Sequence, residues 1–451
     1  MKPMLHSLAL MVAIVTQPFV LSAETSPNIV MIMADDLGWS DVAFHGGNIA
    51  TPNLDRLVKQ SLELTHHYVA PVCTPTRIGL LTGRYWSRFG VTGPRNERSL
   101  PWETVSLAKA LQSVGYETCL VGKWHLGSKP EWGPNRFGFD HAYGSLAGGV
   151  NSWRHFYKKG PYSITWHRNG ELIVEKGHVT DLLTTEAIGW LRGRGDRPFF
   201  LYVPFTAVHL PVDEPTEWLD RVPDAIEGDV ARHYAACVMH MDDAVGKILA
   251  AVHMSGKSDN TLIVFTSDNG GSTAENNDTR YPFDSYPQGR LPGRNLPLRG
   301  KKGELYEGGI RVPTAVCWPG VLKPGKCATP IHITDWMPTL CALAKYDEKR
   351  KLNWDGKDIW PALTNKTELA ERDLYWAGPS FRSSALRRGD WKLIVKNTRT
   401  EPIRQLFNVA ADPNEALDLA PKMPLKVKEL SERLDAIASN DRDAEVPAGT
   451  P

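Results

Sequence analysis

The sequence lacks an excess of charge of either sign, since its 52 lysines and arginines nearly balance 51 aspartates and glutamates. A chain without a strong positive excess has no overall field to hold it on nucleic acid or on an anionic membrane. It also lacks, after residue 23, any segment that approaches the ~20 apolar residues of a transmembrane helix. We therefore expect no nucleic-acid partner and no stable membrane insertion. An anionic substrate would have to be bound by local charges.

Cysteine is scarce as well, with six residues in 451. One of them, Cys73, belongs to a motif discussed below, and the five that remain are an odd set that indicates no disulfide framework. Cys317 and Cys327 are the nearest pair in sequence. Cys119 and Cys237 stand among apolar neighbours, which is typical of small buried hydrophobic residues. The pairing stays open.

The first 23 residues have the order of features found in a secretory signal peptide. Lys2 precedes an apolar stretch from Leu8 to Val15, and small residues end the segment before Glu24. The apolar core is too short to span a bilayer comfortably, although an uncleaved anchor is the alternative. We expect an exported protein that is periplasmic or secreted, or lysosomal or extracellular in a eukaryotic host.

Four apolar runs of strand length predict a parallel sheet. Runs that are apolar on both faces suit parallel strands covered by helices, and the ligands of such sheets gather beyond the carboxyl ends of the strands. Each run leads into polar residues: Asn28–Met33 into Asp35 and Asp36, Tyr116–Val121 into Lys123 and His125, Phe199–Val203 towards His209, and Thr261–Phe265 into Asp268 and Asn269. These polar residues are therefore expected to converge.

Helical patterns alternate with these runs, notably at 104–114, 180–191 and 234–252. The alternation predicts a three-layer α/β domain over residues 24–345. Beyond it, short β-like pieces and a polar helix around 425–437 predict a smaller α+β subdomain over 346–451. One long loop, from 276 to 298, is rich in proline, glycine, arginine and asparagine.

Asp35, Asp36, Asp268 and Asn269 offer only hard oxygen ligands. Such ligands suit Ca²⁺ or Mg²⁺ and suit zinc or copper poorly. Adjacent aspartates can instead cap a following element, which is the alternative for Asp35 and Asp36. A second acidic-amide pair after another strand favours the metal site.

Cys73 opens the run Cys73-Thr-Pro-Thr-Arg77. A thiol beside an arginine is ordinarily interpreted as a nucleophile or a redox site. Pro75 followed by apolar residues places position 73 at the start of a helix, where free N–H groups and the helix dipole favour anions. Arg77, one turn along, is expected to face the same site, with a surface ion pair as the alternative.

Two lysines and two histidines complete the candidate site. Lys123 and Lys302 are expected to hold an anionic group, with Lys301 as the alternative to Lys302, because fixed cations stabilise charge that develops in a transition state. His125 and His209 are candidate acids or bases near neutral pH. A structural histidine is the alternative for His209, whose local motif is the weaker of the two.

The motifs together resemble those of the type I sulfatases, in order from Pro27 to about Leu419. The resemblance rests on Cys73–Arg77 and on the segments Asp35–Trp39, Gly122–Gly127, Ser267–Gly270, Leu298–Lys302 and Glu307–Arg311. It implies an alkaline-phosphatase-like αβα fold and a sulfuric ester hydrolase. It also implies that a maturation enzyme oxidises Cys73 to Cα-formylglycine, and that Ca²⁺, the family's usual ion, binds position 73 with the four oxygen ligands.

The same resemblance implies a division of roles. The hydrated aldehyde at position 73 attacks sulfur, His209 protonates the leaving alcohol, and His125 acts on the position-73 hydroxyl as sulfate is eliminated. Arg77 braces the hydrate, while Lys123 and Lys302 hold the sulfate oxygens. A serine in place of the aldehyde would need a second attack by water on sulfur.

Within the family the sequence is most similar to the arylsulfatase B group, which are N-acetylgalactosamine-4-sulfatases. Scaffold motifs carry this likeness: His233–Ala235, Met241–Gly246, His332–Thr339 and Asp355–Asp358. The implied substrate is a sulfated carbohydrate of the galactose or N-acetylgalactosamine 4-sulfate type, and Trp153, Arg154 and His155 are candidates to bind the sugar.

Two other functions stay open. One is hydrolysis of phosphomonoesters or phosphonate esters, because the same superfamily and the same anion site serve phosphorus. The other is a catalytically silent, glycan-binding relative. The oligomeric state also stays open.

Overall fold

The structure is a computed structural model that describes residues 26–446, apart from 277–280, 282–285, 348–350 and 368. The predicted signal peptide, residues 1–23, lies outside the described residues. In the described part of the chain no helix is both long enough and apolar enough to cross a bilayer. All six cysteines are described, and each is a free thiol.

A ten-stranded mixed sheet forms the centre of the main domain, in the order β11-β2-β10-β9-β1-β8-β4-β5-β6-β7. A two-stranded pair, β3 with β12, lies beside it, and a separate four-stranded antiparallel sheet follows. The strands are β1 Asn28–Ala34, β2 Leu62–Leu64, β3 His67–Tyr68, β4 Glu117–Lys123, β5 His141–Ser145, β6 Trp166–Arg168, β7 Glu171–Leu172, β8 Phe199–Pro204, β9 Thr261–Ser267, β10 Ala315–Cys317, β11 Gly325–Cys327, β12 Ile331–His332, β13 Asp373–Ala377, β14 Ser383–Arg388, β15 Trp391–Lys396 and β16 Ile403–Asn408.

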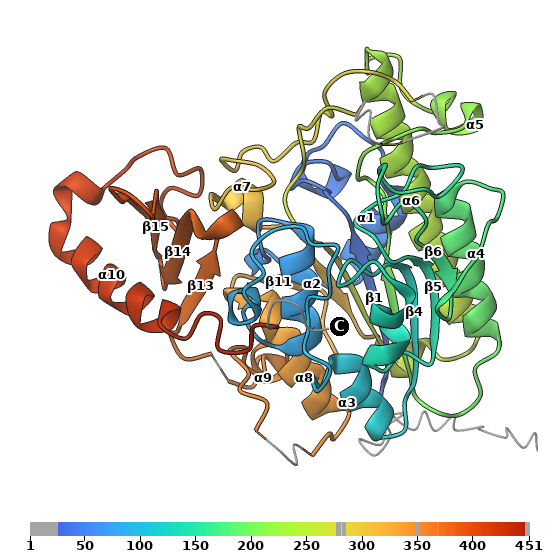
Figure 1. Cartoon of the computed structure of the whole chain (residues 1–451), viewed down its shortest axis with the longest axis horizontal. Coiled ribbons are helices and arrows are strands. Elements are labelled where there is room, and N and C mark those ends of the chain that lie inside the picture. The colour runs from blue at the N-terminus through green and yellow to red at the C-terminus, as the bar shows by residue number, and fades with distance from the viewer. Residues whose placement is uncertain (1–25, 277–280, 282–285, 348–350, 368, 447–451) are drawn as a thin grey trace, which may run out of the picture.

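Helices cover both faces of the main sheet (Figure 1). They are α1 Pro52–Lys59, α2 Cys73–Thr82, α3 Leu107–Ser113, α4 Val179–Arg192, α5 Thr216–Leu219, α6 Asp229–Met254, α7 Glu307–Ile310, α8 Trp336–Leu343, α9 Trp360–Leu363 and α10 Pro424–Ala438. α2, α3 and α8 pack on one face, whereas α1, α4 and α6 pack on the other. The predicted three-layer arrangement is confirmed.

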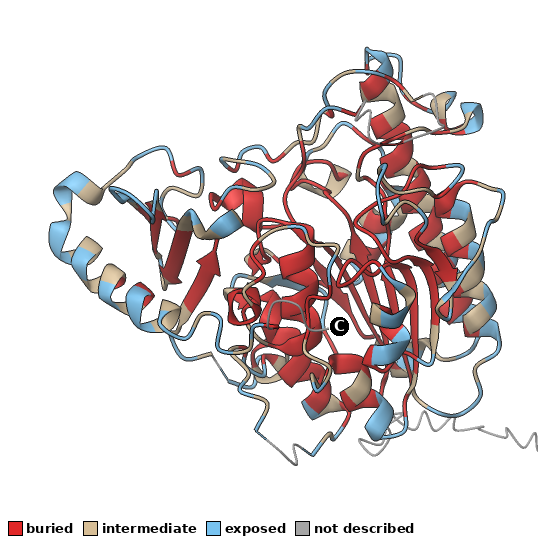
Figure 2. Ribbon diagram, viewed as in Figure 1, coloured by how far each residue is buried: buried red, intermediate tan, exposed pale blue. Residues whose placement is uncertain are grey.

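The central strand β1 shows why its sequence is apolar throughout. Ile29, Met31 and Met33 pack with the helices of one face, and Val30 and Ile32 with those of the other. Side chains alternate across a strand, so a strand buried on both faces needs apolar residues at every position. Figure 2 shows the central strands of this sheet as buried.

The four strands β13–β16 form the sheet of the C-terminal subdomain. One face packs on the main core through residues such as Trp376 and Ile394, and the other carries Leu393 and Leu406 against α10. The predicted β-like pieces correspond to β14 and β15, and the predicted polar helix to α10. The outer side of α10 is exposed (Figure 2).

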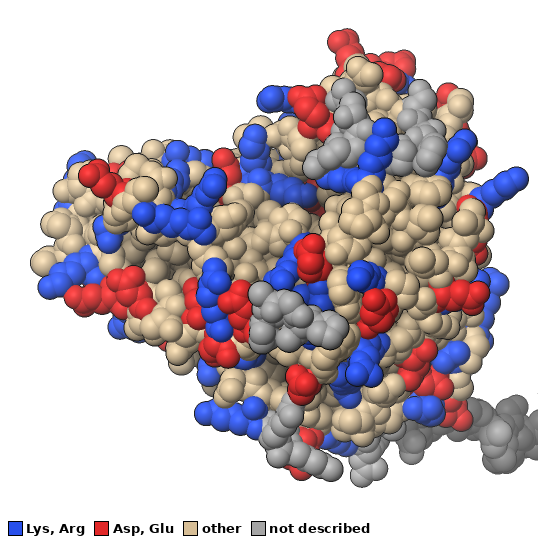
Figure 3. Space-filling model, viewed as in Figure 1, with Lys and Arg blue, Asp and Glu red and all other residues tan. Residues whose placement is uncertain are grey.

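Positive and negative side chains are interspersed on the face seen in Figure 3, in keeping with the balanced composition. No single sign of charge dominates that face. Selection for an anionic group therefore has to come from the residues inside a site.

His240, buried in α6, links three segments of the main domain. Its Nδ1 lies 2.8 Å from Oε2 of Glu214, its Nε2 lies 3.1 Å from Oδ1 of Asp181 in α4, and its ring stacks on Trp218 of α5. Burial alone would lower the pKa of His240, but its bonds to Asp181 and Glu214 raise it to about 9. The imidazolium is thus held between two carboxylates beside the segment that carries His209.

We expect His240→Gln to destabilise the protein in a pH-dependent way. Because folding raises the pKa of His240 above its ordinary value of 6.5, the protonated ring stabilises the folded state. This stabilisation is fully present below pH 6.5 and is lost as pH rises through about 9. The difference in unfolding free energy between wild type and variant should be largest at acidic pH and should shrink at alkaline pH. Urea unfolding across this range measures it, with the exposed His253→Gln on the same helix as the control. A pH-independent difference would contradict the role of the charge.

Candidate active site

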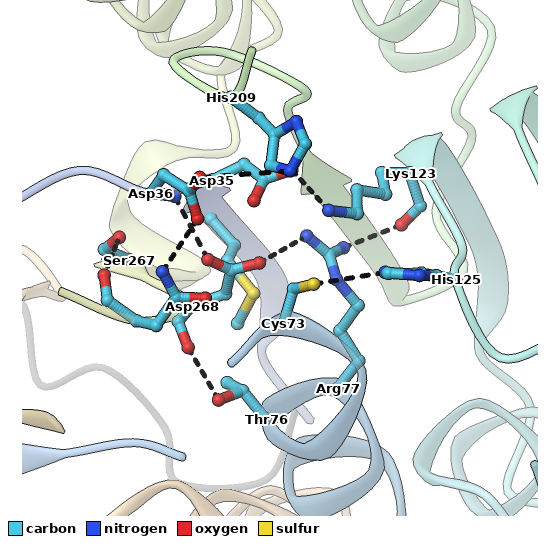
Figure 4. A network of polar contacts seen from close by, with 12 residues as sticks. Asp35, Asp36, Cys73, Thr76, Arg77, Lys123, His125, His209, Ser267 and Asp268 are labelled. Atoms are coloured by element: carbon cyan, nitrogen blue, oxygen red, sulfur yellow. Dashed lines mark hydrogen bonds and ion pairs between the residues drawn. The ribbon is translucent and has the colours of Figure 1, made fainter. Parts of the chain in front are cut away.

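Strand register brings the predicted acidic pairs together. β1 and β9 are parallel, with Ala34 opposite Ser267, so Asp35 and Asp268 leave the sheet side by side. The Asp268 N–H donates to the Ala34 carbonyl (3.0 Å), and the Asp36 N–H donates to Oδ1 of Asp268 (3.2 Å). Figure 4 shows these carboxylates converging beyond the strand ends.

Three buried carboxylates are compensated at this point by three cations, of which Lys123 and Arg77 are buried and Lys302 is partly buried. Nζ of Lys123 lies 2.6 Å from Oδ2 of Asp35, and Nζ of Lys302 lies 2.7 Å from Oδ1 of Asp36. The Arg77 guanidinium, fully buried, donates to Oδ2 of Asp268 (2.9 Å) and to the Lys123 carbonyl (2.7 Å). An unpaired buried charge is expensive, so the six side chains hold one another in place. Lys301 is exposed and donates to Thr273, so Lys302 is the lysine that reaches the cluster.

The carboxylate cluster has the properties of a site for a hard cation. Oδ1 of Asp35 and Oδ1 of Asn269 are buried and accept no hydrogen bond from the described residues. Burial and the neighbouring Asp268 raise the pKa of Asp35 well above its ordinary value, despite Lys123, because negative charge is crowded there. Buried carboxylate and amide oxygens that lack a hydrogen-bond partner are suited to bind Ca²⁺ or Mg²⁺.

Cys73 begins α2, as its sequence predicts, and points at His125. Its Sγ lies 3.2 Å from Nδ1 of His125. Burial raises the pKa of the Cys73 thiol, and the lowering effect of Lys123 does not overcome it. A reactive thiolate needs the opposite shift, so an unmodified Cys73 is a poor nucleophile.

His125 and His209 enclose the site from two further strand ends. His125 follows β4 in the left-handed backbone region (φ 58°), and its burial together with Lys123 lowers its pKa well below 6.5. Such strained positions in non-glycine residues cluster at functional sites. Burial and Lys302 likewise lower the pKa of His209. Nδ1 of His209 lies 2.6 Å from the Leu210 carbonyl oxygen. A carbonyl oxygen only accepts, so Nδ1 is the donor in this bond. The other ring nitrogen, Nε2, faces Oδ2 of Asp36 at 3.9 Å.

Two adjacent glycines form a wall against these histidines. A Cβ on Gly148 would lie 2.4 Å from the His125 ring, and a Cβ on Gly149 would lie 3.2 Å from Nδ1 of His209. The backbone of the segment 148–155 therefore touches both candidate acid-base residues. Only glycine allows so close an approach without displacing either ring.

The three predicted sugar-binding residues lie in this segment, but two are exposed and one is buried. Trp153 is 37% exposed and meets the His178 ring edge to face, and Arg154 is also exposed. His155 is buried, stacked on Trp166, with Nε2 bonded to the Gly177 carbonyl. The prediction that His155 grips a sugar is wrong, because its ring anchors the loop from beneath.

Sequence reasoning missed two hydroxyl groups that brace the site. Thr76 Oγ1 donates to the Asp268 carbonyl (2.6 Å), which ties α2 to the end of β9. Ser267 Oγ donates to the Asn269 carbonyl and accepts from the Leu37 N–H. Both lie inside motifs that were recognised, at positions where sequence alone shows no chemistry.

A family model described as Sulfatase matches residues 27–346, which include every residue placed above. The chain belongs to the sulfatase family. This sulfatase is 31% identical to arylsulfatase J of Mus musculus over 470 residues, covering 92% of this chain and 76% of the relative. It is 31% identical to N-acetylgalactosamine-6-sulfatase of Rattus norvegicus (89% and 76% covered) and 28% identical to steryl-sulfatase of Mus musculus (94% and 84% covered).

Solved structures agree with the fold of this sulfatase. Ps i-CgsB, solved in complex with k-i-k-neocarrahexaose, superposes with a TM-score of 0.83 at 30% identity, covering 93% of this chain and 95% of that one. The PsFucS1 sulfatase from Pseudoalteromonas sp. gives a TM-score of 0.75 at 25% identity (95% and 92% covered). The predicted alkaline-phosphatase-like fold is confirmed, and the protein is a sulfuric ester hydrolase.

We expect Gly148→Ala to impair this sulfatase without unfolding it. The three atoms nearest to the new methyl group all belong to the His125 side chain and none to the backbone, so we expect the ring to shift while the backbone stays. A displacement of about 1 Å in a catalytic group lowers turnover by ~10²-fold. Steady-state kinetics on an aryl sulfate and a thermal melt measure the two effects. Gly189→Ala in α4, where a Cβ meets open space, is the control, and equal activity in both variants would contradict the wall.

Proposed function

We propose that this sulfatase hydrolyses sulfate monoesters of a carbohydrate, with formylglycine made from Cys73 as the source of the nucleophile and with Ca²⁺ bound to the carboxylate cluster. The observation that carries the proposal is the position of Cys73. It is buried at the start of α2, bonded to His125, and its thiol has a raised pKa. Such a thiol gains a function in this site only once it is converted to another group.

Asp35, Asp36, Asp268 and Asn269, together with the oxygen of the modified position 73, would hold the cation. When bound, Ca²⁺ would supply positive charge to a sulfate oxygen and lower the pKa of the hydroxyl at position 73. The three carboxylates and the three cations Lys123, Lys302 and Arg77 formally cancel. A divalent ion therefore leaves the site with a net positive charge, which favours an anionic ester.

The remaining residues act on the ester itself. Lys123 and Lys302 are aimed at the cluster from two sides and stabilise charge on the sulfate oxygens. His125, on the position-73 side, takes the proton from the hydroxyl there as sulfate leaves. His209 donates from Nε2 to the departing alcohol. The negative charge of the ester offsets Lys302, which otherwise keeps the pKa of His209 low.

The sugar is proposed to be galactose or N-acetylgalactosamine sulfated at position 4, bound against Trp153 and Arg154. Support for the sugar comes from the exposed faces of these two residues and from a relative named N-acetylgalactosamine-6-sulfatase. The 4-position is proposed from the resemblance of the scaffold motifs to those of N-acetylgalactosamine-4-sulfatases. The likeness to Ps i-CgsB, solved with a neocarrahexaose, also favours a galactose-based glycan. Export through the N-terminal signal would bring the protein to such polymers.

The mass of the tryptic peptide 60–77 from natively produced protein tests the modification. We expect a peptide lighter than the cysteine form by the difference between CH₂SH and CHO. Cys73→Ala should abolish hydrolysis, because the nucleophile is gone, while the Arg77–Asp268 ion pair and the fold remain. A cysteine-form peptide together with full activity would refute the mechanism.

A substrate panel tests the sugar. We expect turnover of 4-sulfated galactose or N-acetylgalactosamine to exceed that of the 6-sulfated sugars and of an aryl phosphate, since the scaffold motifs resemble those of N-acetylgalactosamine-4-sulfatases. Faster phosphate hydrolysis would favour the phosphoesterase alternative. Glycan binding without turnover in protein that carries the modification would indicate a silent relative.

Chelation tests the cation. We expect treatment with a chelator to abolish activity and to lower the thermal midpoint, because a ligand bound only to the folded state stabilises it. Ca²⁺ should restore both more fully than Mg²⁺. In Asn269→Ala the midpoint should respond less to Ca²⁺, because one oxygen ligand is lost. Unchanged activity and stability after complete removal of divalent ions would contradict the site.

A further inference from the structure

Lys302 belongs to a loop, residues 298–306, that is bonded both to the main domain and to the C-terminal subdomain. The loop connects the region after β9 to α7, and its own contacts with the main domain include the bond from the Gly303 N–H to the Pro71 carbonyl (2.8 Å) and that from the Lys302 N–H to the Gly271 carbonyl (3.2 Å). In Figure 1, α7 lies on the side of the main domain that faces β13–β15.

A buried ion cluster joins α7 to the C-terminal subdomain. Nζ of Lys392, in β15, lies 2.9 Å from Oε1 of Glu307 and 2.9 Å from Oε1 of Glu415. The other carboxylate oxygen of Glu415 accepts the Glu307 N–H at 2.6 Å, and Tyr68 donates to Oε2 of Glu307 at 2.7 Å. Lys392, Glu307 and Glu415 are all fully buried.

Three further contacts from the subdomain hold the body of the loop. Arg299 donates to the Glu415 carbonyl (2.8 Å), Lys396 donates to the Tyr306 hydroxyl (2.7 Å), and that hydroxyl donates to Gln405 (2.7 Å). Strand alternation explains the pattern, because Lys392 and Lys396 lie on the face of β15 that looks towards the main domain. The loop is therefore bonded to the subdomain near its start through Arg299 and at its last residue through the Tyr306 hydroxyl, and Glu307, which follows it, is bonded there as well.

The carboxylate of Glu307 in this cluster keeps its negative charge. Burial alone would raise the pKa of Glu307, but Lys392, Arg387 and Arg311 lower it to about 2. Glu307 therefore stays ionised at neutral pH. Burial and the negative charge of Glu307 raise the pKa of Glu415, despite Lys392. Removing Lys392 takes away the cation that both carboxylates share, and breaking a buried ion pair in this way strongly destabilises the contact between its remaining partners.

We propose that Lys392 and Glu415 are positioning residues for Lys302, so that the C-terminal subdomain completes the active site without touching the substrate. They fix the start of α7 and the loop before it, and the loop in turn fixes the Lys302 ammonium 2.7 Å from Asp36. The inference rests on the proposed role of Lys302 in holding the sulfate group.

Hydrogen exchange and kinetics on the full-length protein test this inference together. In Lys392→Met we expect faster amide exchange in peptides covering 298–306 and a fall in kcat/KM on an aryl sulfate of about 10-fold to 100-fold. In a Lys302→Ala background the same substitution should lower kcat/KM by less than about 2-fold, because residues acting through one group are not additive.

Arg88→Met is the matched control. Arg88 is also buried at the junction with the C-terminal part of the chain, but its partners are Asp355, Asp441 and the Ile437 carbonyl, outside the Lys302 loop. It should lower stability while leaving the exchange of 298–306 and the kcat/KM of the folded protein unchanged. Lys396→Met, which loses only the bond to the Tyr306 hydroxyl, repeats the test if Lys392→Met does not fold.

Unchanged exchange in the 298–306 peptides of the Lys392 variant, or of the Lys396 variant if that one is used, would overturn the inference. Equal losses of kcat/KM in Arg88→Met and in the Lys392 or Lys396 variant would overturn it too. So would a loss of kcat/KM from that variant that is as large in the Lys302→Ala background as in the wild type. If the variant shows faster amide exchange only in the 298–306 peptides and the wild-type protein hydrolyses no sulfate ester, the result would support the positioning and refute the proposed function instead.

Discussion

The site depends on the mutual compensation of buried charges. Asp35, Asp36 and Asp268 are withdrawn from water at one point, and each is paired there with a cation that is itself buried or nearly so. None of these charges is tolerable alone in such surroundings. The cations come from three separate elements: α2, the end of β4 and the loop before α7. Correct folding of all three is therefore a condition for the stability of the cluster, and the cluster in turn fixes their ends relative to one another.

Much of this could be predicted because the strands that supply the ligands are the most deeply buried ones. A parallel strand covered on both faces must be apolar along its length, so β1, β8 and β9 are visible in the sequence and the polar residues that follow them stand out. β4 is less apolar, yet the Lys123–His125 motif marks its end. The helix at Cys73 follows from Pro75 and the apolar residues beyond it.

The remaining features arise from contacts that the sequence does not display. Strand β5 is short and contains His141 and Gly144, so it lacks the apolar run that marks the other parallel strands. In the sequence His155 follows Trp153 and Arg154 and looks like a third residue that could bind a ligand. Only its packing on Trp166 in the folded protein shows that its ring faces inward. The Glu307–Lys392–Glu415 cluster joins residues more than a hundred positions apart, for which a single sequence contains no periodic signal.

The charge cluster and the exposed side chains near it are structurally separate. The charged residues lie on strand ends, on α2 and on the loop before α7, buried or nearly so and paired with one another, so a change at any of them disturbs the rest. Trp153 and Arg154 are the exposed residues of the segment 148–155, whose Gly148 and Gly149 lie against the rings of His125 and His209. Their side chains can therefore change without moving the chemistry. Relatives named for sterol and for sugar sulfates resemble this chain to nearly the same degree, as that separation requires. The overall likeness thus reflects the buried charge cluster and its scaffold, whose packing does not depend on exposed side chains such as Trp153 and Arg154.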